Sequence, residues 1–272
     1  MPGLNTPLEI YKLLNKSNCK KCMLPSCLAF AAAVISGEKK LSDCPDLDDE
    51  TIQSIGGETA PRKTTEDEMT GQLANLKQEA AKTDYASVAE KLGAVAVGET
   101  LAINCLGKDF IIDSTGEMNS ECHTNIWVHG PLLKYITHST GKSICENWLP
   151  FNQLQGSANW SRFFSHRCEE DMRLLVDAHT ELFFELLDLF GAQTITGVID
   201  TDYSLLIHPL PKLPMVINYW NAEDDFTSKL SIFFDSTAPD NLNIEFIYTI
   251  TRGLVEMFRA LIVKHNMTGK LF

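Results

Sequence analysis

The stretch NCKKCMLPSCLAFAAAVISGEKKLSDCP, residues 18–45, decides the fold of the N-terminal part of the chain because it holds four cysteines in a compact pattern. Cys19, Cys22, Cys27 and Cys44 have the spacing C-x2-C-x4-C-x16-C, and Pro45 follows the last of them. Thiolates are the preferred ligands of iron–sulfur clusters and of structural zinc. A cubane cluster needs one cysteine sulfur for each of its four irons, from four directions. A tight turn would supply the first two, a helix start the third and a returning segment the fourth. The pattern therefore predicts a four-iron, four-sulfur (4Fe-4S) cluster.

Two other interpretations of the cysteines stay open. Zinc also takes four cysteines, but its usual pattern is two C-x2-4-C pairs, and only the first pair here has that form. Disulfides suit an oxidising compartment, whereas the chain opens with Met1-Pro2-Gly3 and shows no export signal. We favour the cluster and expect a cytoplasmic protein, with a structural zinc site as the main alternative.

The residues around the cysteines predict two short helices. Thr6-Pro7-Leu8-Glu9 has the form of a helix start, with an N-cap, a proline in the first turn and a capping box. Ser26 is expected to cap a second, alanine-rich helix that ends at Gly37. The N-terminus of that helix would direct free N–H groups at Cys27 and the cluster, where they stabilise negative charge.

The stretch from Tyr11 to Pro45 resembles the cluster domain of the large subunit of the corrinoid iron–sulfur protein. It is also similar to the cluster domain in the B subunit of Rnf-type electron-transport complexes. In those families the four cysteines ligate a low-potential cluster, which implies the same role for the four cysteines here. The resemblance also implies anaerobic metabolism and a protein redox partner, such as a corrinoid protein or a methyltransferase. Met23 stands where these families usually have glycine, and we interpret it as a flexible side chain that shields the cluster from water.

The charge of the chain limits its partners. The sequence holds 23 Lys and Arg against 36 Asp and Glu, a net charge of −13. An acidic surface repels nucleic acids and anionic membranes, so neither is expected as a partner. No apolar run approaches the roughly 20 residues that cross a bilayer, so no membrane insertion is expected.

Acidic residues gather directly after the fourth cysteine, at Asp43, Asp46, Asp48, Asp49 and Glu50. Such a run is often only a solvated face. The functional alternative is that it favours a low reduction potential and offers a docking face to a basic redox partner.

The chain divides into three parts by composition. Residues 1–50 form the predicted cluster domain, and residues 51–83 a turn-rich, polar linker in which a short amphipathic helix is predicted between Met69 and Lys82. Residues 84–272 carry strand patterns at 94–97, 101–106, 108–113, 203–208, 215–220 and 229–234, and helix patterns at 127–139, 169–190 and 243–264. Clustered strands between long helices predict an α+β fold: a small helical domain, then a larger domain with a mostly antiparallel sheet packed by helices.

The larger domain also resembles a known family that has no assigned function, the domain of unknown function numbered 3786. The carrying residues are Gly130-Pro131-Leu132-Leu133-Lys134-Tyr135, Trp148-Leu149-Pro150-Phe151, Leu210-Pro211-Lys212-Leu213-Pro214, Trp220, Asp225-Phe226 and Phe233-Phe234-Asp235-Ser236. The resemblance implies an architecture and supplies no catalytic residues.

No enzyme signature is found in the larger domain. A nucleophile elbow, a P-loop, a dinucleotide fingerprint and the corrinoid-binding Asp-x-His-x-x-Gly pattern are all missing from the sequence. Cys122-His123 and His166-Arg167-Cys168 are a weaker candidate for a second metal site. Cys105 and Cys145 are interpreted as isolated thiols, His179 as a core histidine, and the tryptophans Trp127, Trp148, Trp160 and Trp220 as core or cleft walls.

Three functions remain on the sequence alone. The first is an electron carrier whose small domain holds the cluster and whose larger domain docks a partner. The second is a corrinoid-handling or reductive-activation factor that uses cluster electrons. The third is a scaffold with a structural metal. We favour the electron carrier over a stand-alone enzyme.

Overall fold

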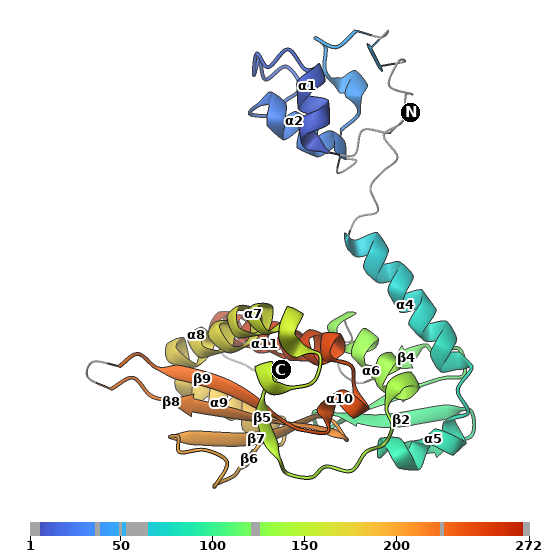
Figure 1. Cartoon of the computed structure of the whole chain (residues 1–272), viewed down its shortest axis with the longest axis vertical. Coiled ribbons are helices and arrows are strands. Elements are labelled where there is room, and N and C mark those ends of the chain that lie inside the picture. The colour runs from blue at the N-terminus through green and yellow to red at the C-terminus, as the bar shows by residue number, and fades with distance from the viewer. Residues whose placement is uncertain are drawn as a thin grey trace. The chain divides into compact units, whose positions relative to one another are not determined.

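The computed structural model describes residues 6–35, 39–48, 51–52, 65–120, 126–223 and 226–268 (Figure 1). The chain divides into two compact units, Met1–Gln72 and Leu73–Phe272, and each is described by itself. In these described ranges no helix is long and apolar enough to cross a membrane.

The small unit is built from α1 (Pro7–Leu13), α2 (Cys27–Ile35) and the short 3-10 helix η1 (Leu41–Asp43). The two α-helices pack against each other and against η1 through a small apolar core. That core consists of Ile10, Leu14, Cys27, Phe30, Ala31, Val34 and Leu41. Because Cys27 belongs to it, the packing of α2 also fixes the third cysteine.

Both predicted helix starts in the small unit are confirmed. Thr6 Oγ1 accepts a 3.3 Å hydrogen bond from the Glu9 N–H, and Glu9 Oε2 accepts a 2.9 Å bond from the Thr6 N–H, which makes a capping box. Ser26 Oγ accepts from the N–H of Ala29 at 3.1 Å at the start of α2. Gly37, the predicted end of α2, lies outside the described residues.

The larger unit contains two antiparallel sheets, and the predicted α+β class is confirmed. One sheet has the order β1-β2-β3-β4 and the other the order β5-β9-β8-β7-β6. Their bounds are β1 Val95–Val97, β2 Thr100–Cys105, β3 Lys108–Ile112, β4 Met118–Asn119, β5 Trp148–Pro150, β6 Gln193–Thr194, β7 Tyr203–Leu210, β8 Leu213–Trp220 and β9 Lys229–Asp235. The strands predicted near 95, 101, 108, 203, 215 and 229 are all present.

Helices cover the apolar side of the five-stranded sheet, where Figure 1 shows α7, α8 and α11 grouped together. The helices of this part of the chain are α4 Thr65–Ala81, α5 Tyr85–Leu92, α6 Ile126–His138, α7 Ser161–Phe164, α8 Asp171–Ala178, α9 Thr180–Leu189, α10 Ala238–Asn241 and α11 Ile244–Thr268, with the single turns η2 Phe151–Gln153 and η3 Ser157–Asn159 and the π-helix η4 Ser165–Glu170. Leu76 and Ala80 anchor α4 in the main core.

The prediction of one continuous helix over 169–190 is wrong. The first residues belong to the π-helix η4, and the chain leaves helical geometry at His179, with φ −145° and ψ 47°, before α9 begins. The apolar repeat continues through the break, so periodicity alone did not show it. His179 is therefore a half-buried residue at a joint between two helices and does not lie on the apolar face of one helix.

The helix predicted over 127–139 is confirmed as α6. The helix begins at Ile126, and Pro131 lies inside it. In the five-stranded sheet, Pro209 sits between Ile207 and Leu210, where the pairing of β7 with β8 shifts register. A bulge tolerates proline because the ladder hydrogen bond is already interrupted there.

Candidate metal centre

Cys19, Cys22, Cys27 and Cys44 all line one hollow of the small unit. The first two lie in the loop between α1 and α2, Cys27 is the first residue of α2, and Cys44 directly follows η1. Cys27 is buried, Cys22 and Cys44 are half-buried, and Cys19 is exposed. The fold thus gathers the four cysteines that the sequence singles out, with one of them at the protein surface.

The loop that carries the first two cysteines has an unusual backbone. Lys16, Asn18, Lys20 and Met23 all have positive φ, between 49° and 65°. Non-glycine residues rarely adopt this conformation, and such strain concentrates at functional sites. Left-handed residues spaced along a loop turn successive N–H groups toward a common concave side, an arrangement found around phosphate and iron–sulfur sites. Of the described N–H groups of this loop, that of Asn18 donates to a cysteine sulfur, whereas those of Ser17 and Met23 are bonded within the loop.

Asn18 connects this loop to the start of α2 by two hydrogen bonds. Its side-chain Oδ1 accepts from the Cys27 N–H at 2.8 Å, and its own N–H donates to Cys27 Sγ at 3.4 Å. The expectation of free N–H groups at this helix start is therefore only partly right, because the N–H groups of Cys27 and Ala29 are used by side chains. The backbone donor that reaches the third sulfur comes from Asn18.

Asp46 also holds this loop. Its carboxylate accepts hydrogen bonds from Lys21 Nζ at 3.0 Å, Asn15 Nδ2 at 2.8 Å and Cys19 Sγ at 3.5 Å. These bonds, led by the one from Lys21, hold the pKa of Asp46 below its usual range. Once Cys19 ligates iron as a thiolate it has no proton to donate, so Asp46 then holds the loop through Lys21 and Asn15.

The described acids of the run after Cys44 make local hydrogen bonds. Beside Asp46, Asp43 accepts from the Lys40 N–H at 2.9 Å, and Asp48 accepts from the Thr51 N–H at 2.6 Å. Asp49 and Glu50 lie outside the described residues. The described acids of the run thus act as local hydrogen-bond acceptors that shape the chain around Cys44.

Ionisation of the Cys44 thiol is unfavourable without a bound metal group. Burial raises the pKa of this thiol, and the negative charges of Asp46 and of the thiolates of Cys22 and Cys27 add to the effect, while a hydrogen bond from the Asp46 backbone opposes it. Ionising several thiols together is unfavourable without a cation, since like charges repel. Iron would remove that penalty, so the donor set fits an iron–sulfur cluster.

Among the described residues, no group of three or more His, Cys, Asp or Glu side chains is gathered closely enough for a single metal ion. A cluster does not need such a group, because each thiolate binds its own iron.

Met23 does not shield the hollow, and this expectation was wrong. Its side chain is 90% exposed, and the residue is not part of the lining. With φ at 65°, it occupies the left-handed conformation that glycine adopts without strain. The position therefore keeps the backbone shape typical of glycine while it presents a large apolar side chain to solvent.

The second metal site suggested for the larger unit is not assembled in the described structure. Cys122 and His123 lie outside the described residues. Cys168 is fully buried, which raises the pKa of its thiol, while His166 two residues earlier is exposed. One faces the core and the other faces solvent, so these two do not share a site.

The remaining candidate side chains are two cysteines and the four tryptophans of the larger unit. Cys105 is buried and Cys145 is exposed. The four tryptophans are all half-buried; Trp160 packs on Tyr248 with ring centroids 5.1 Å apart, and Trp220 donates a 2.8 Å hydrogen bond from Nε1 to the Asp200 carbonyl.

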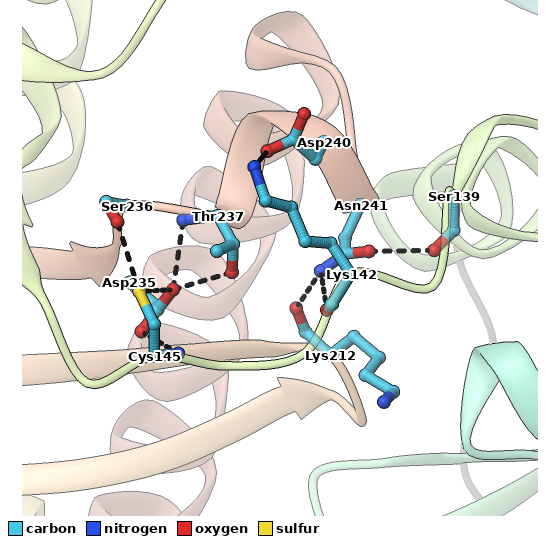
Figure 2. Close-up of polar contacts among 9 residues, drawn as sticks. All are labelled: Ser139, Lys142, Cys145, Lys212, Asp235, Ser236, Thr237, Asp240 and Asn241. Carbon is cyan, nitrogen blue, oxygen red and sulfur yellow. Dashed lines mark hydrogen bonds and ion pairs between the residues drawn. The ribbon is translucent and has the colours of Figure 1, made fainter.

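Sequence reasoning missed a buried polar network in the larger unit (Figure 2). Asn241 is fully buried; its Nδ2 donates to the carbonyls of Lys142 and Lys212 at 2.9 and 3.1 Å, and its Oδ1 accepts from Ser139 Oγ at 3.1 Å. These bonds fasten the irregular segment 139–147 to the end of the five-stranded sheet. The only sequence signal was a polar cluster, Asp235 to Asn241, directly after an apolar strand.

With the geometry established, comparison with known proteins assigns the larger unit. The family model DUF3786, described as "Domain of unknown function (DUF3786)", matches residues 84–257, more than half of the chain. This chain belongs to the DUF3786 family. A second model, described as "Putative Fe-S cluster", matches residues 14–45 of this DUF3786 protein, which include all four cysteines.

The N-terminal segment of this DUF3786 protein is similar to subunits of known complexes. It is 45% identical over 56 residues to the corrinoid/iron-sulfur protein large subunit of Moorella thermoacetica, covering 21% of this chain and 13% of that protein. It is 49% identical over 47 residues to the acetyl-CoA decarbonylase/synthase complex subunit gamma of Methanocaldococcus jannaschii, covering 17% of this chain and 10% of that protein. The match thus spans only a small part of these relatives. No solved structure matches the chain.

Proposed function

We propose that this DUF3786 protein binds a 4Fe-4S cluster through Cys19, Cys22, Cys27 and Cys44 and passes single electrons to a protein partner. The observation that carries the proposal is that all four cysteines line one hollow. The match of residues 14–45 to an iron–sulfur cluster model supports it independently. A bound cluster supplies one-electron chemistry; this chain supplies the thiolates and a strained, concave backbone around them.

The surroundings of the cysteines favour a low reduction potential. Four thiolates and the Asp46 carboxylate, which lies 3.5 Å from Cys19 Sγ, all oppose the addition of another negative charge. The Asn18 N–H bonded to Cys27 Sγ acts in the other direction, because hydrogen bonds to ligand sulfurs favour reduction. Lys21 pairs with Asp46 at 3.0 Å and offsets part of its charge, so the low potential that we propose rests mainly on the four thiolates.

The partner is proposed from the relatives. Both relatives above are subunits of corrinoid/iron–sulfur or acetyl-CoA decarbonylase/synthase proteins, and their similarity is confined to the cluster segment. A corrinoid protein or a methyltransferase of anaerobic metabolism is therefore the proposed acceptor of the electrons. In this proposal residues 1–50 form the cluster domain, residues 51–83 the linker, and residues 84–272 the domain that docks the partner.

A second function is a corrinoid-handling or reductive-activation factor, in which the larger domain itself binds the cofactor or its carrier. The similarity to a corrinoid/iron–sulfur large subunit favours it, but that similarity lies in the cluster segment and does not extend into the DUF3786 domain. Addition of cobalamin to the purified protein separates the two functions. A spectral change that persists when the cysteines are replaced would place a corrinoid on the larger domain.

The proposal is tested on protein purified without oxygen. We expect about four irons and four sulfides per chain, a broad brown absorption, and bleaching of that absorption when a photoreduced low-potential donor is added. The reduced protein should show the spectrum of a one-electron-reduced cluster. Zinc in place of iron, or a cluster that no accessible donor reduces, would overturn the electron-carrier function, and zinc would favour a structural scaffold.

A further inference from the structure

The cluster segment has a charge opposite to that of the whole chain. Between Ile10 and Gly37 the sequence contains four lysines and no acidic residue, although the chain as a whole has a net charge of −13. Lys16, Lys20 and Lys21 belong to the loop of the first two cysteines, and all three are exposed. A basic patch therefore surrounds the two cysteines nearest the start of the loop.

The nearby acid does not cancel this patch. Asp46 is bonded to Lys21, Asn15 and Cys19 at once, and its side chain is 23% exposed, against 60% for Lys21. The lysine thus remains open to solvent while the carboxylate turns toward the loop. Lys20 has no described acidic partner, and Lys16 lies 5.6 Å from the ring centroid of Tyr11, which leaves its charge in place.

Exposed apolar side chains lie in this loop and at the start of α2. Met23 follows Cys22 directly and is 90% exposed, and Leu28 follows Cys27 and is 46% exposed. Large apolar side chains that are this exposed are common at interaction surfaces, and methionine adapts its shape to a partner. An apolar centre within a charged rim is the usual anatomy of a protein interface.

Electron transfer becomes much slower with distance, so a partner must dock where a ligand of the cluster reaches the surface. Cys19 is exposed and lies within this loop. Charges beyond about 8 Å are largely screened at physiological ionic strength, so a docked partner senses the charges of this loop more than charges farther away.

We propose that the surface formed by Lys16, Lys20, Lys21, Met23 and Leu28 is the docking face of the cluster, and that its partner is an acidic redox protein with an apolar contact for Met23. The proposal rests on the electron-carrier function: the larger domain holds the partner, and this face is where the partner meets the cluster, which adds the place of electron exit and the charge of the partner there. The acidic run after Cys44 is the competing docking surface, and the salt dependence described next separates the two.

The experiment measures oxidation of the photoreduced protein by two cobalt(III) complexes of opposite charge, the trianionic trisoxalato complex and the tricationic hexaammine complex. Each takes one electron from the reduced cluster and becomes cobalt(II). Rates are followed by stopped flow as salt is increased. If the basic face surrounds the electron exit, the rate with the anion falls as salt rises, because screening weakens attraction. If the net charge of the chain governs, the rate with the cation falls instead, which would overturn the proposal.

Two variants locate the effect. Lys16→Glu combined with Lys20→Glu should reverse the salt dependence of the anionic oxidant. Lys82→Glu, a change at an exposed lysine of the larger unit, should leave it unchanged. Equal effects of the two changes would contradict a local docking face. A protein with no reducible cluster gives no rate to measure, and that result counts against the electron-carrier function and not against the charge of its surface.

Met23→Ala tests the apolar contact with a small acidic ferredoxin as the electron acceptor. We expect a several-fold slower reaction at low protein concentration and no change with the small cobalt complexes, which need no apolar contact. An unchanged rate with the ferredoxin would remove Met23 from the docking face.

Discussion

The thiol of Cys145 lies 3.5 Å from Oδ1 of Asp235, and the backbone N–H of Cys145 donates a 3.0 Å hydrogen bond to Oδ2 of the same carboxylate (Figure 2). Asp235 is fully buried at the end of β9 and also accepts bonds from the N–H and Oγ1 of Thr237, at 2.9 and 2.6 Å. The pair fastens the segment 139–147 to the sheet. Cys145 therefore has its partners inside the larger unit.

This relationship makes Cys145 a suitable control for the proposed ligands. We expect Cys22→Ser to abolish the native cluster, because it removes one of four thiolates around the hollow. Cys145→Ser should keep full iron and sulfide, since a hydroxyl can still bond to Asp235 and Ser236. Iron and sulfide analysis of the two purified variants decides the matter. Equal contents would contradict the ligand assignment.

Asp235 should make the larger unit sensitive to acid. Burial alone would raise its pKa, but hydrogen bonds from Thr237 and Cys145 favour the carboxylate and hold the pKa below the usual range. A folded-state pKa below the unfolded value of about 3.9 adds stability at higher pH, and this stability is lost as pH falls through the folded value. We expect Asp235→Asn to cost about 1–3 kcal/mol near neutral pH and less near pH 3 or below. Urea unfolding from neutral pH to pH 3 measures this difference in the free energy of unfolding.

A control for this prediction lies in the same network. Asp240 forms a 2.7 Å ion pair with Lys142, but both side chains are substantially exposed, at 41% and 56%. Asp240→Asn should therefore change the free energy of unfolding by less than about 1 kcal/mol. If the difference in the free energy of unfolding between wild type and Asp235→Asn stays constant down to acid pH, the charge of Asp235 is not involved.

Asn18 should be required to keep the cluster. Its side chain accepts from the Cys27 N–H, and its φ of 49° is left-handed. Asn18→Gly keeps the backbone freedom and removes only the side-chain bond, at an expected cost of about 1 kcal/mol. Asn18→Ala loses the bond and adds backbone strain. We expect the rate of cluster loss to a chelator to rise in the order wild type, Gly, Ala.

An equal rate in the Gly and Ala variants of Asn18 would show that the left-handed backbone contributes nothing to cluster retention. An unchanged rate in both would remove Asn18 from the support of the centre.

Met23→Gly should stabilise the small unit. The residue has φ 65°, and its side chain is 90% exposed, so the change relieves left-handed strain and loses little packing. The gain is at most about 1 kcal/mol, because glycine also gives the unfolded chain more freedom. Thermal unfolding of the cluster-loaded protein measures it, with Met23→Ala as the control that keeps the strain. A lower midpoint for Met23→Gly than for Met23→Ala would contradict the strain argument.

Local sequence signals determined the elements of this protein and the identity of its candidate ligands. The capping box at Thr6 and Glu9, the cap at Ser26 and most strands follow from hydrogen bonds and periodicities within a few residues. The four cysteines could be named because the spacing of ligands along a short chain already restricts which metal group they fit. The fold class followed from the order of strand and helix patterns along the chain.

Tertiary structure decided what lies between residues far apart in the chain. The division of the strands into two sheets and the break at His179 leave no local pattern in the sequence. The contacts of Tyr135 leave none either: its hydroxyl donates to the Leu92 carbonyl at 2.7 Å and accepts from the Lys212 N–H at 3.1 Å. Ser139 and Asn241 are 102 residues apart, and their pairing depends on how the whole core packs. The periodicity of apolar residues shows which side of a helix or strand is buried. Which neighbour covers that side depends on the free energy of packing all the elements together.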